Sequence, residues 1–113
     1  TIKYMINKIV SILDSTTEAV FVSDALTGEI IYINDTGAEY VGRNKGACLG
    51  ERCYQIFWER SHNCERCESI DKCQGHFYEE DTILKSNKRK IHMKARIEDW
   101  DGRQVKIHYL LPL

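Results

Sequence analysis

The chain has 113 residues, the length of one domain, and it buries roughly two-thirds of its unfolded surface on folding. Its net charge is −1, with 42% hydrophobic and 29% charged residues, which is ordinary for a globular protein. This balance predicts no broad attraction to nucleic acid or to an anionic membrane, and no apolar run approaches the roughly 18 residues of a transmembrane helix. The absence of an initiator methionine and of a secretory signal indicates a segment of a longer protein.

The five cysteines are concentrated in one part of the chain. Four of them lie within residues 50–75, whereas residues 1–47 and 74–113 contain none. A secreted disulfide scaffold usually spreads its cysteines along the chain to staple the whole fold. We therefore expect a cytoplasmic domain with a local cysteine site, whether or not the parent protein is anchored in a membrane.

The first segment has the pattern of an amphipathic helix over residues 2–14. Its apolar residues recur at four-three-four spacing: Ile2, Ile6, Ile9 and Leu13. Such a helix either packs on its own domain or forms the end of a coiled coil or a dimer contact. Two heptads are too few to choose between these alternatives.

Two β-type runs follow, at 19–24 and 29–33, and the turn between them predicts an antiparallel hairpin. Asn34 then supplies a side chain suited to the N-cap of a short helix that extends to about Val41. Gly42 stands where a left-handed residue commonly ends a helix.

The middle of the chain predicts three further helices. Two are short, at 45–49 and 53–58, and the first of them is closed by Gly50. The third is expected over about 76–86, because Phe77, Ile83 and Leu84 fit one side of a helix.

Two alternating segments end the chain, at 91–97 and 105–111, and Asp101-Gly102 between them is a strong reverse-turn signal. The predicted elements are therefore a helix, a hairpin, several short helices, a longer helix and a second hairpin. Strands at both ends with helices between them indicate an α+β fold on one antiparallel sheet.

This order resembles the PAS sensor domain. Residues 12–34 look like the PAS opening, in which a helix leads into two strands ending in Asn, here Asn34. Gly42 and Gly50 match two glycines that bracket the next short helix, and residues 99–103 resemble the turn before the penultimate strand. The resemblance implies a PAS-like antiparallel sheet flanked by short helices over residues 15–113, preceded by an N-terminal amphipathic helix or linker at 1–14.

The PAS sheet has five strands in the order 2-1-5-4-3, with the last strand in the centre. The predicted elements include four strands, the last of which stops near Leu113. An unfilled centre would leave backbone donors and acceptors unpaired. We therefore expect the central strand to be missing, or to be supplied by a swapped segment or a partner chain.

One subset of PAS domains carries Gly-x-x-Cys-Tyr followed by Cys-x-x-Cys. Residues 50–54 together with Cys64 and Cys67 match this pattern, whereas Cys73 is not carried over with them. Such domains commonly belong to bacterial sensor histidine kinases and diguanylate cyclases. The resemblance implies a non-catalytic, homodimeric sensor of a two-component phosphorelay, which acts on an effector domain in the same parent chain.

The cysteine stretch allows three chemical states. Thiolates from a tight Cys-x-x-Cys turn and its flanks could hold zinc or an iron–sulfur cluster, with the ligands Cys53, Cys64, Cys67 and Cys73. The same cysteines could instead form structural or redox-switching disulfides, or remain free thiols. His62 or His76 could replace one sulfur, and Cys48 is expected to be a small buried apolar residue.

PAS domains often hold a small molecule between the sheet and the short helices. The candidates to line such a cavity are Phe21, Ile31, Tyr40, Phe57, Trp58, Ile83, Met93 and Tyr109. A plain hydrophobic core needs the same residues. The chain has no flavin-photosensor signature and no motif for covalent c-type haem, and His92 and His108 are expected to face solvent because they alternate with apolar residues.

Three rival functions remain at this level. The chain could be an interaction and dimerisation module with structural cysteines, or the PAS input of a diguanylate cyclase or transcriptional regulator. A small zinc domain that contacts nucleic acid is disfavoured by the net charge of −1. The basic run 85–90 has no interleaved aromatic residues and is expected to be a solvated loop, so neither nucleic acid nor a membrane is expected as a direct partner.

Overall fold

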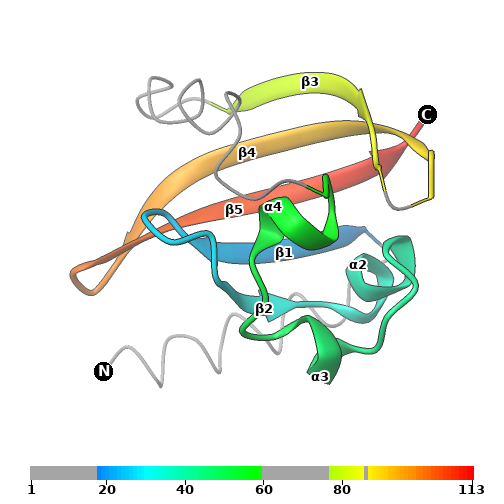
Figure 1. The fold of residues 1–113 in the computed structure, drawn as a ribbon. Helices are drawn as coiled ribbons and strands as arrows, with labels where there is room; N and C mark the ends of the chain where they lie inside the picture. The colour runs from blue at the N-terminus through cyan, green and yellow to red at the C-terminus, as the bar shows by residue number, and fades with distance from the viewer. Residues whose placement is uncertain (1–17, 60–76, 86) are drawn as a thin grey trace.

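The computed structural model describes residues 18–59, 77–85 and 87–113, and Figure 1 shows its ribbon. The elements in these residues are β1 (Ala19–Asp24), β2 (Ile30–Ile33), α2 (Asp35–Tyr40), α3 (Lys45–Cys48), α4 (Cys53–Ile56), β3 (Tyr78–Ile83), β4 (Lys90–Trp100) and β5 (Arg103–Pro112). The helix expected over 2–14 lies outside the described residues.

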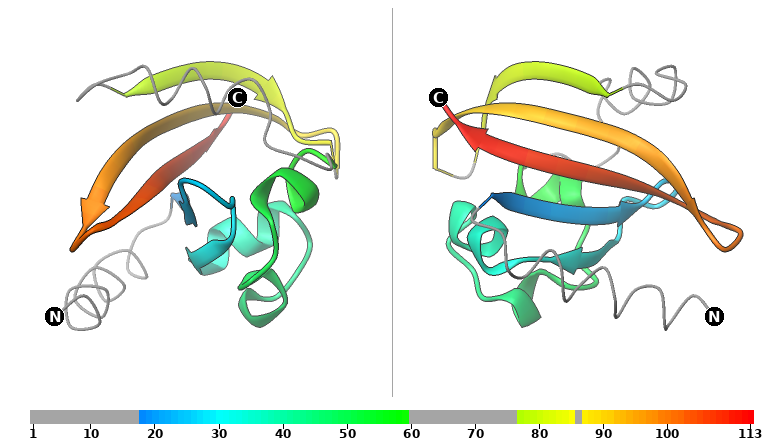
Figure 2. Two further views of the ribbon diagram at one scale, coloured as in Figure 1. Left: turned by 60° about the vertical axis from the view of Figure 1, so that its left-hand side comes forward. Right: turned by 180° about the vertical axis from the view of Figure 1, so that it is seen from behind.

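The strands form one antiparallel five-stranded sheet in the order β2-β1-β5-β4-β3. The central strand β5 pairs with β1 from Ala19↔Leu110 to Asp24↔Val105, and with β4 along its whole length. The sheet is strongly curved, and the helices lie on one side of it (Figure 2). The α+β class is confirmed, and the strand order is the one that the PAS resemblance implies.

The helix expected over 76–86 is wrong, because residues Tyr78–Ile83 form the edge strand β3. β3 pairs with β4 from Tyr78↔Ala95 to Ile83↔Lys90, and its residues alternate between half-buried and exposed. An edge strand needs little apolar surface, and residues 79–81 are all charged. The sequence of this strand therefore lacks the alternation of apolar and polar residues by which a strand is usually recognised. The expected count of four strands was short by this one, and β5 of the same chain fills the centre.

Local turn chemistry accounts for the second hairpin. Asp101 and Gly102 connect β4 to β5 and have φ values of 54° and 91°. Two successive residues with positive φ suit the right-handed twist of the flanking strands. The predicted reverse turn is confirmed.

Asn34 links the first hairpin to α2, as predicted for an N-cap. Its Oδ1 accepts hydrogen bonds from the N–H groups of Gly37 at 2.8 Å and Val20 at 3.0 Å. Beyond the helix Gly42 adopts a φ of 67°, the left-handed conformation expected there. Among the residues described, no helix combines the length and the apolar character needed to cross a membrane.

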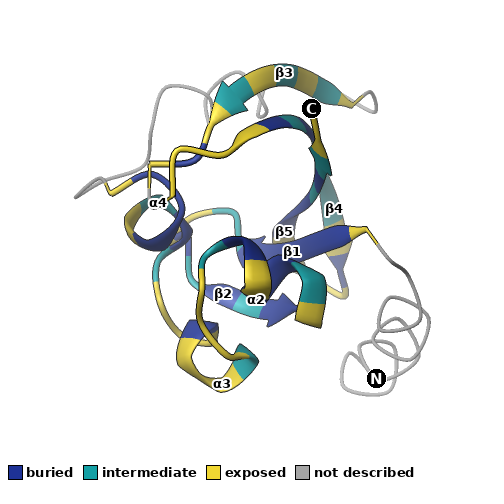
Figure 3. Ribbon diagram, turned by 90° about the vertical axis from the view of Figure 1, so that its right-hand side faces the viewer, coloured by how far each residue is buried: buried dark blue, intermediate teal, exposed yellow. Residues whose placement is uncertain are grey.

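Apolar side chains are buried on both faces of the sheet. Figure 3 colours the buried residues dark blue, and β1 is almost entirely of that colour. The inner face, under the helices, carries the larger cluster, to which β1 contributes Ala19 and Phe21. The outer face carries a smaller cluster: Val20, Val22, Tyr32, Trp100, Val105 and Ile107. Since β1 contributes to both clusters, its sequence is a continuous apolar run instead of an alternating one.

Candidate functional site

The inner face brings together most of the residues predicted to line a ligand cavity. Five of the eight lie in the inner cluster between the sheet and the helices: Phe21, Tyr40, Phe57, Trp58 and Met93. They come from β1, α2, the end of α4 and β4, so residues far apart in the sequence converge there. This grouping suits a ligand site and a hydrophobic core equally well.

Three rings stack at the centre of the inner cluster. Phe21 of β1 lies between Phe57, with ring centroids 4.3 Å apart, and His108 of β5, with centroids 4.2 Å apart. The planes are inclined by 16° and 7° respectively, so both contacts are face to face. An imidazole is thus part of the surface that the helical segment covers.

The expectation that His108 faces solvent is wrong, since the residue is 2% exposed. β5 is the central strand, and its residues Val105 to His108 are buried on both faces in succession. Alternation with Ile107 and Tyr109 was therefore a misleading guide. The signal that could have revealed His108 is the position of the last strand at the centre of a PAS-like sheet.

The other three candidate cavity residues lie elsewhere. Ile31 and Tyr109 pack against the outer cluster, and Ile83 is 44% exposed at the end of β3. Burial raises the pKa of the Tyr109 phenol, which has Lys94 opposite it on β4. Within the described residues, the inner-face site is therefore formed by the five residues above together with His108.

Two of the five cysteines belong to the described residues, and both are buried in the inner cluster. Cys48 ends α3 with no exposed surface, and burial raises the pKa of its thiol, as suits a residue with an apolar role. Cys53 begins α4 and is 4% exposed. The remaining proposed ligands Cys64, Cys67 and Cys73, and the alternatives His62 and His76, lie outside the described residues. In the described ranges no three His, Cys, Asp or Glu side chains are arranged to hold a metal ion.

The backbone around Cys53 is bonded to the first hairpin. The N–H of Cys53 donates to the carbonyl of Gly28 at 2.9 Å, and the N–H of Ile30 donates to the carbonyl of Glu51 at 2.9 Å. Gly50 returns a bond to the carbonyl of Ile30, also at 2.9 Å, with its own φ at 85°. Residues 50–53 therefore run along the edge of β2 and attach the start of the cysteine stretch to the sheet.

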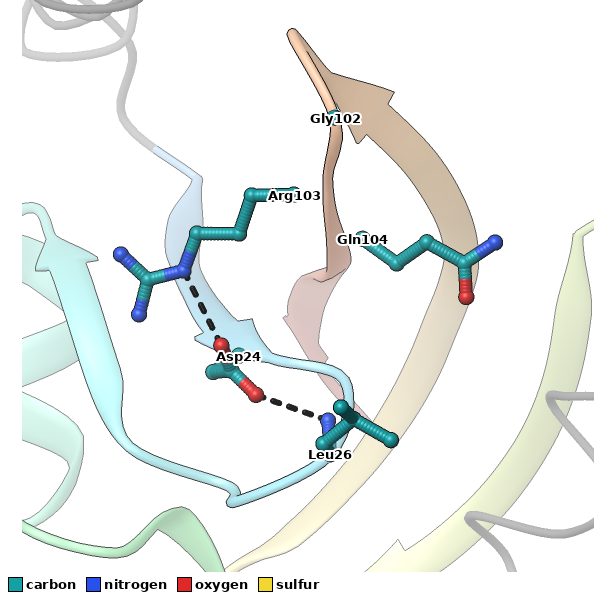
Figure 4. A pocket seen from close by; sticks show the side chains of 5 residues that line it. All are labelled: Asp24, Leu26, Gly102, Arg103 and Gln104. Carbon is teal, nitrogen blue, oxygen red and sulfur yellow. Dashed lines mark hydrogen bonds and ion pairs between the residues drawn. The ribbon is translucent and has the colours of Figure 1, made fainter.

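A second feature lies where the β1–β2 turn meets the β4–β5 hairpin. A pocket of about 290 Å³ is lined by Asp24, Leu26, Gly102, Arg103 and Gln104, as Figure 4 shows. Arg103 Nε donates to Asp24 Oδ2 at 3.0 Å, and the other carboxylate oxygen accepts from the N–H groups of Leu26 and Thr27.

The Asp24 carboxylate is held in its ionised form. Partial burial raises the pKa of Asp24, but the hydrogen bonds from Thr27, Leu26 and Arg103 outweigh burial and lower it below 3.8. Arg103 also approaches Glu29, with an N–O distance of 3.8 Å. No local sequence pattern indicates this ion pair, because its partners are 79 residues apart.

The family model described as PAS domain matches residues 17–108 of the chain. Among curated proteins, none matches it. The match covers the first hairpin, the short helices, the whole cysteine stretch, β3 and β4, and it ends within β5.

Solved structures show the same fold. The PAS domain of nitrogen regulation protein NR(II) from Vibrio parahaemolyticus has a TM-score of 0.75 at 10% identity, over 93% of this chain and 97% of that one. A PAS domain from a two-component sensor histidine kinase has a TM-score of 0.73 at 14% identity, over 97% of each chain. A LOV protein of Rhodobacter sphaeroides has a TM-score of 0.70 at 15% identity, over 98% of this chain and 68% of its own.

Proposed function

Because this chain belongs to the PAS domain family, we propose that it is the signal-sensing module of a bacterial signal-transduction protein. In this proposal the segment catalyses no reaction and biases an effector domain of the same parent chain. Its parent is a sensor histidine kinase, a class that one of the similar structures represents. The module works as a homodimer in the cytoplasm, where thiols are kept reduced.

The proposed input is the cysteine stretch, with Cys53, Cys64, Cys67 and Cys73 as its reactive residues. One observation carries this assignment: Cys53 is buried against the inner cluster while its N–H is bonded to Gly28 of the first hairpin. A change of state at these thiols would therefore act on α4 and on the sheet together. A sensor domain needs two arrangements of similar free energy, and the signal must favour one of them. The contacts of Cys53 would link the state of the thiols to the arrangement of α4 on the sheet.

Two chemistries fit cysteines at this spacing. Zinc or an iron–sulfur cluster would bind the four sulfurs as thiolates and couple occupancy to the order of the stretch. A reversible disulfide would instead make the stretch respond to oxidants. Both make the thiols of this stretch the input, and both differ from a module in which the cysteines only fill space.

Metal analysis of freshly purified, anaerobic protein tests the input, with thiols counted before and after chelation. We expect bound metal or a cluster together with fewer than five reactive thiols, or a disulfide that forms with oxidant and reverses with reductant. Five free thiols, no bound metal and no reversible disulfide would remove the cysteine stretch as the input.

Paired variants separate a sensory site from a structural staple. Cys64→Ser and Cys67→Ser are expected to abolish metal binding or the disulfide while the sheet still unfolds cooperatively. Cys48→Ala is the matched control, because its thiol is buried in α3 and should not contribute to either chemistry. Loss of folding in both serine variants would show that the stretch is a staple.

The parent class has its own test. The sequence encoded beyond Leu113 is expected to contain a kinase core, and the full-length protein should autophosphorylate at a rate that changes when the thiols are modified. A cyclase or a DNA-binding output would contradict the kinase proposal and leave the sensory one standing.

A further inference from the structure

The edge strand β3 carries acidic side chains that meet a histidine of β4. Glu79 and Asp81 are two residues apart and therefore share one face of β3. Across the strand pair, Asp81 lies directly opposite His92, and Glu79 lies opposite Lys94. Since β3 is at the edge of the sheet, these cross-strand contacts help to set how firmly it is held.

His92 contacts both carboxylates at once. Its Nδ1 is 2.7 Å from Asp81 Oδ1, and its Nε2 is 3.0 Å from Glu79 Oε1. The imidazole is 28% exposed, so the pairs are accessible to solvent but not fully hydrated. The two ring nitrogens face different carboxylates, so one metal ion could not replace both contacts.

This geometry distinguishes the two protonation states of the ring. A neutral imidazole has one N–H and one lone pair, so it can donate to Asp81 or to Glu79 but not to both. The imidazolium has two N–H groups and can donate to both at once. Deprotonation of His92 therefore turns one of these hydrogen bonds into a contact between a lone pair and a carboxylate oxygen.

We propose that His92, Asp81 and Glu79 form a pH-responsive latch that holds the edge strand β3 on β4 when His92 is protonated and loosens it when the proton is lost. The latch is a second input of the domain and does not depend on the chemistry of the cysteine stretch. The ligand of the latch is the proton. The element that it loosens is β3, which follows the cysteine stretch in the sequence.

The charges around His92 set the direction of the response. Hydrogen bonds from the ring to Asp81 and then Glu79 raise the pKa of His92 above 6.5, and burial acts in the opposite direction. On β4, Lys90 and Lys94 flank His92 on the same face and disfavour a further positive charge. On β5 its partner is the apolar Leu111, with Tyr109 opposite Lys94.

Because the pKa is raised on folding, the stabilisation of β3 is complete below about pH 6.5. It is lost as the pH rises through the raised value, and above that pH the strand is held without the second bond. The latch therefore closes on acidification and opens as the pH rises through the raised pKa of His92.

Nuclear magnetic resonance of the whole chain tests the latch. The titration of the His92 ring gives its pKa, and hydrogen exchange gives protection factors, corrected for intrinsic rates, for the amides of Tyr78–Ile83. We expect these factors to fall as the pH rises from below about 6.5 through the measured pKa of His92, tenfold for each unit by which that pKa exceeds the pKa in the open strand. Amides of the opposite edge strand, Ile30–Ile33, should keep their protection.

Matched variants assign the effect to the three side chains. Glu79→Gln should lower the pKa of His92 and reduce the pH dependence, and His92→Gln should abolish it. Glu80→Gln removes the same charge from the adjacent position, which faces the other side of β3, and should leave both unchanged. A pH dependence that survives His92→Gln, or protection that is constant with pH in the parent protein, would overturn the proposal.

Discussion

The ring centroids of Phe21 and Phe57 lie 4.3 Å apart and the two rings are nearly parallel. Phe57 is the C-cap residue of α4, so this contact joins the end of that helix to the sheet. Both side chains are fully buried, and His108 extends the stack on the far side of Phe21. This contact ties α4, and with it the start of the cysteine stretch, to β1 and β5. Packing at this point should therefore dominate the stability of the inner face.

We predict that Phe57→Ala lowers the free energy of unfolding by about 3–5 kcal/mol, because it leaves a cavity beside Phe21. Phe77→Ala is the matched control: Phe77 is 41% exposed and makes an edge contact with Tyr109 at 6.0 Å. Phe77→Ala should lower the free energy of unfolding by much less than Phe57→Ala does. Urea denaturation measures both, and equal losses would contradict the central position of the Phe21–Phe57 stack.

A second prediction concerns Asn34. This residue is 1% exposed, and its side chain forms hydrogen bonds with three backbone groups. Its Oδ1 accepts from Val20 and Gly37, and its Nδ2 donates to the carbonyl of Glu18 at 2.6 Å. Asn34→Ala should cost about 2–4 kcal/mol, because it removes a helix cap and leaves the buried Val20 N–H without that partner.

Asn44→Ala is the control for the cap alone. Asn44 caps α3 through one exposed bond to the N–H of Ala47 at 2.8 Å, so its loss should be about 1 kcal/mol. Thermal or urea unfolding of the two variants gives the comparison. If Asn34→Ala costs no more than Asn44→Ala, the bonds to β1 contribute nothing to stability.

The parts of the fold that were predicted correctly depend on neighbours in the sequence. The side chain of Asn34 is suited to cap a helix, so it predicts the start of α2. The pair Asp101-Gly102 favours a tight turn, so it predicts the β4–β5 hairpin. The edge strand β3 and the burial of His108 depend instead on where a strand lies in the sheet. That position is set by contacts between distant residues, and no local period reports it.

The candidate site divides in the same way. Phe21 and Phe57 were identified because large aromatic residues are seldom left exposed, and the fold brings them together. Ile31 and Tyr109 looked equivalent by composition, yet the pleat turns them to the outer face. The ligand set of the cysteine stretch stays a prediction, since Cys64, Cys67 and Cys73 lie outside the described residues.

The third prediction concerns acid stability and the ion pair between Asp24 and Arg103. The pKa of Asp24 is lowered below 3.8 in the folded protein, so its ionised form stabilises the fold above about pH 3.8. That contribution is lost as the pH falls through the lowered value. Asp24→Asn should therefore reduce stability at pH 5 and reduce the further loss between pH 5 and pH 3.

Arg103→Gln distinguishes the contribution of the guanidinium to the lowered pKa of Asp24 from that of the turn. It should raise the pKa of Asp24 only part of the way to 3.8, because the N–H groups of Leu26 and Thr27 still bond the carboxylate. Carbon-13 titration of the Asp24 carboxyl measures this, with urea unfolding at each pH beside it. Asp101→Asn, in the exposed turn of the same hairpin, is the control and should leave the acid dependence unchanged. An Asp24 pKa that does not move in Arg103→Gln would show that the turn, and not the ion pair, holds the charge.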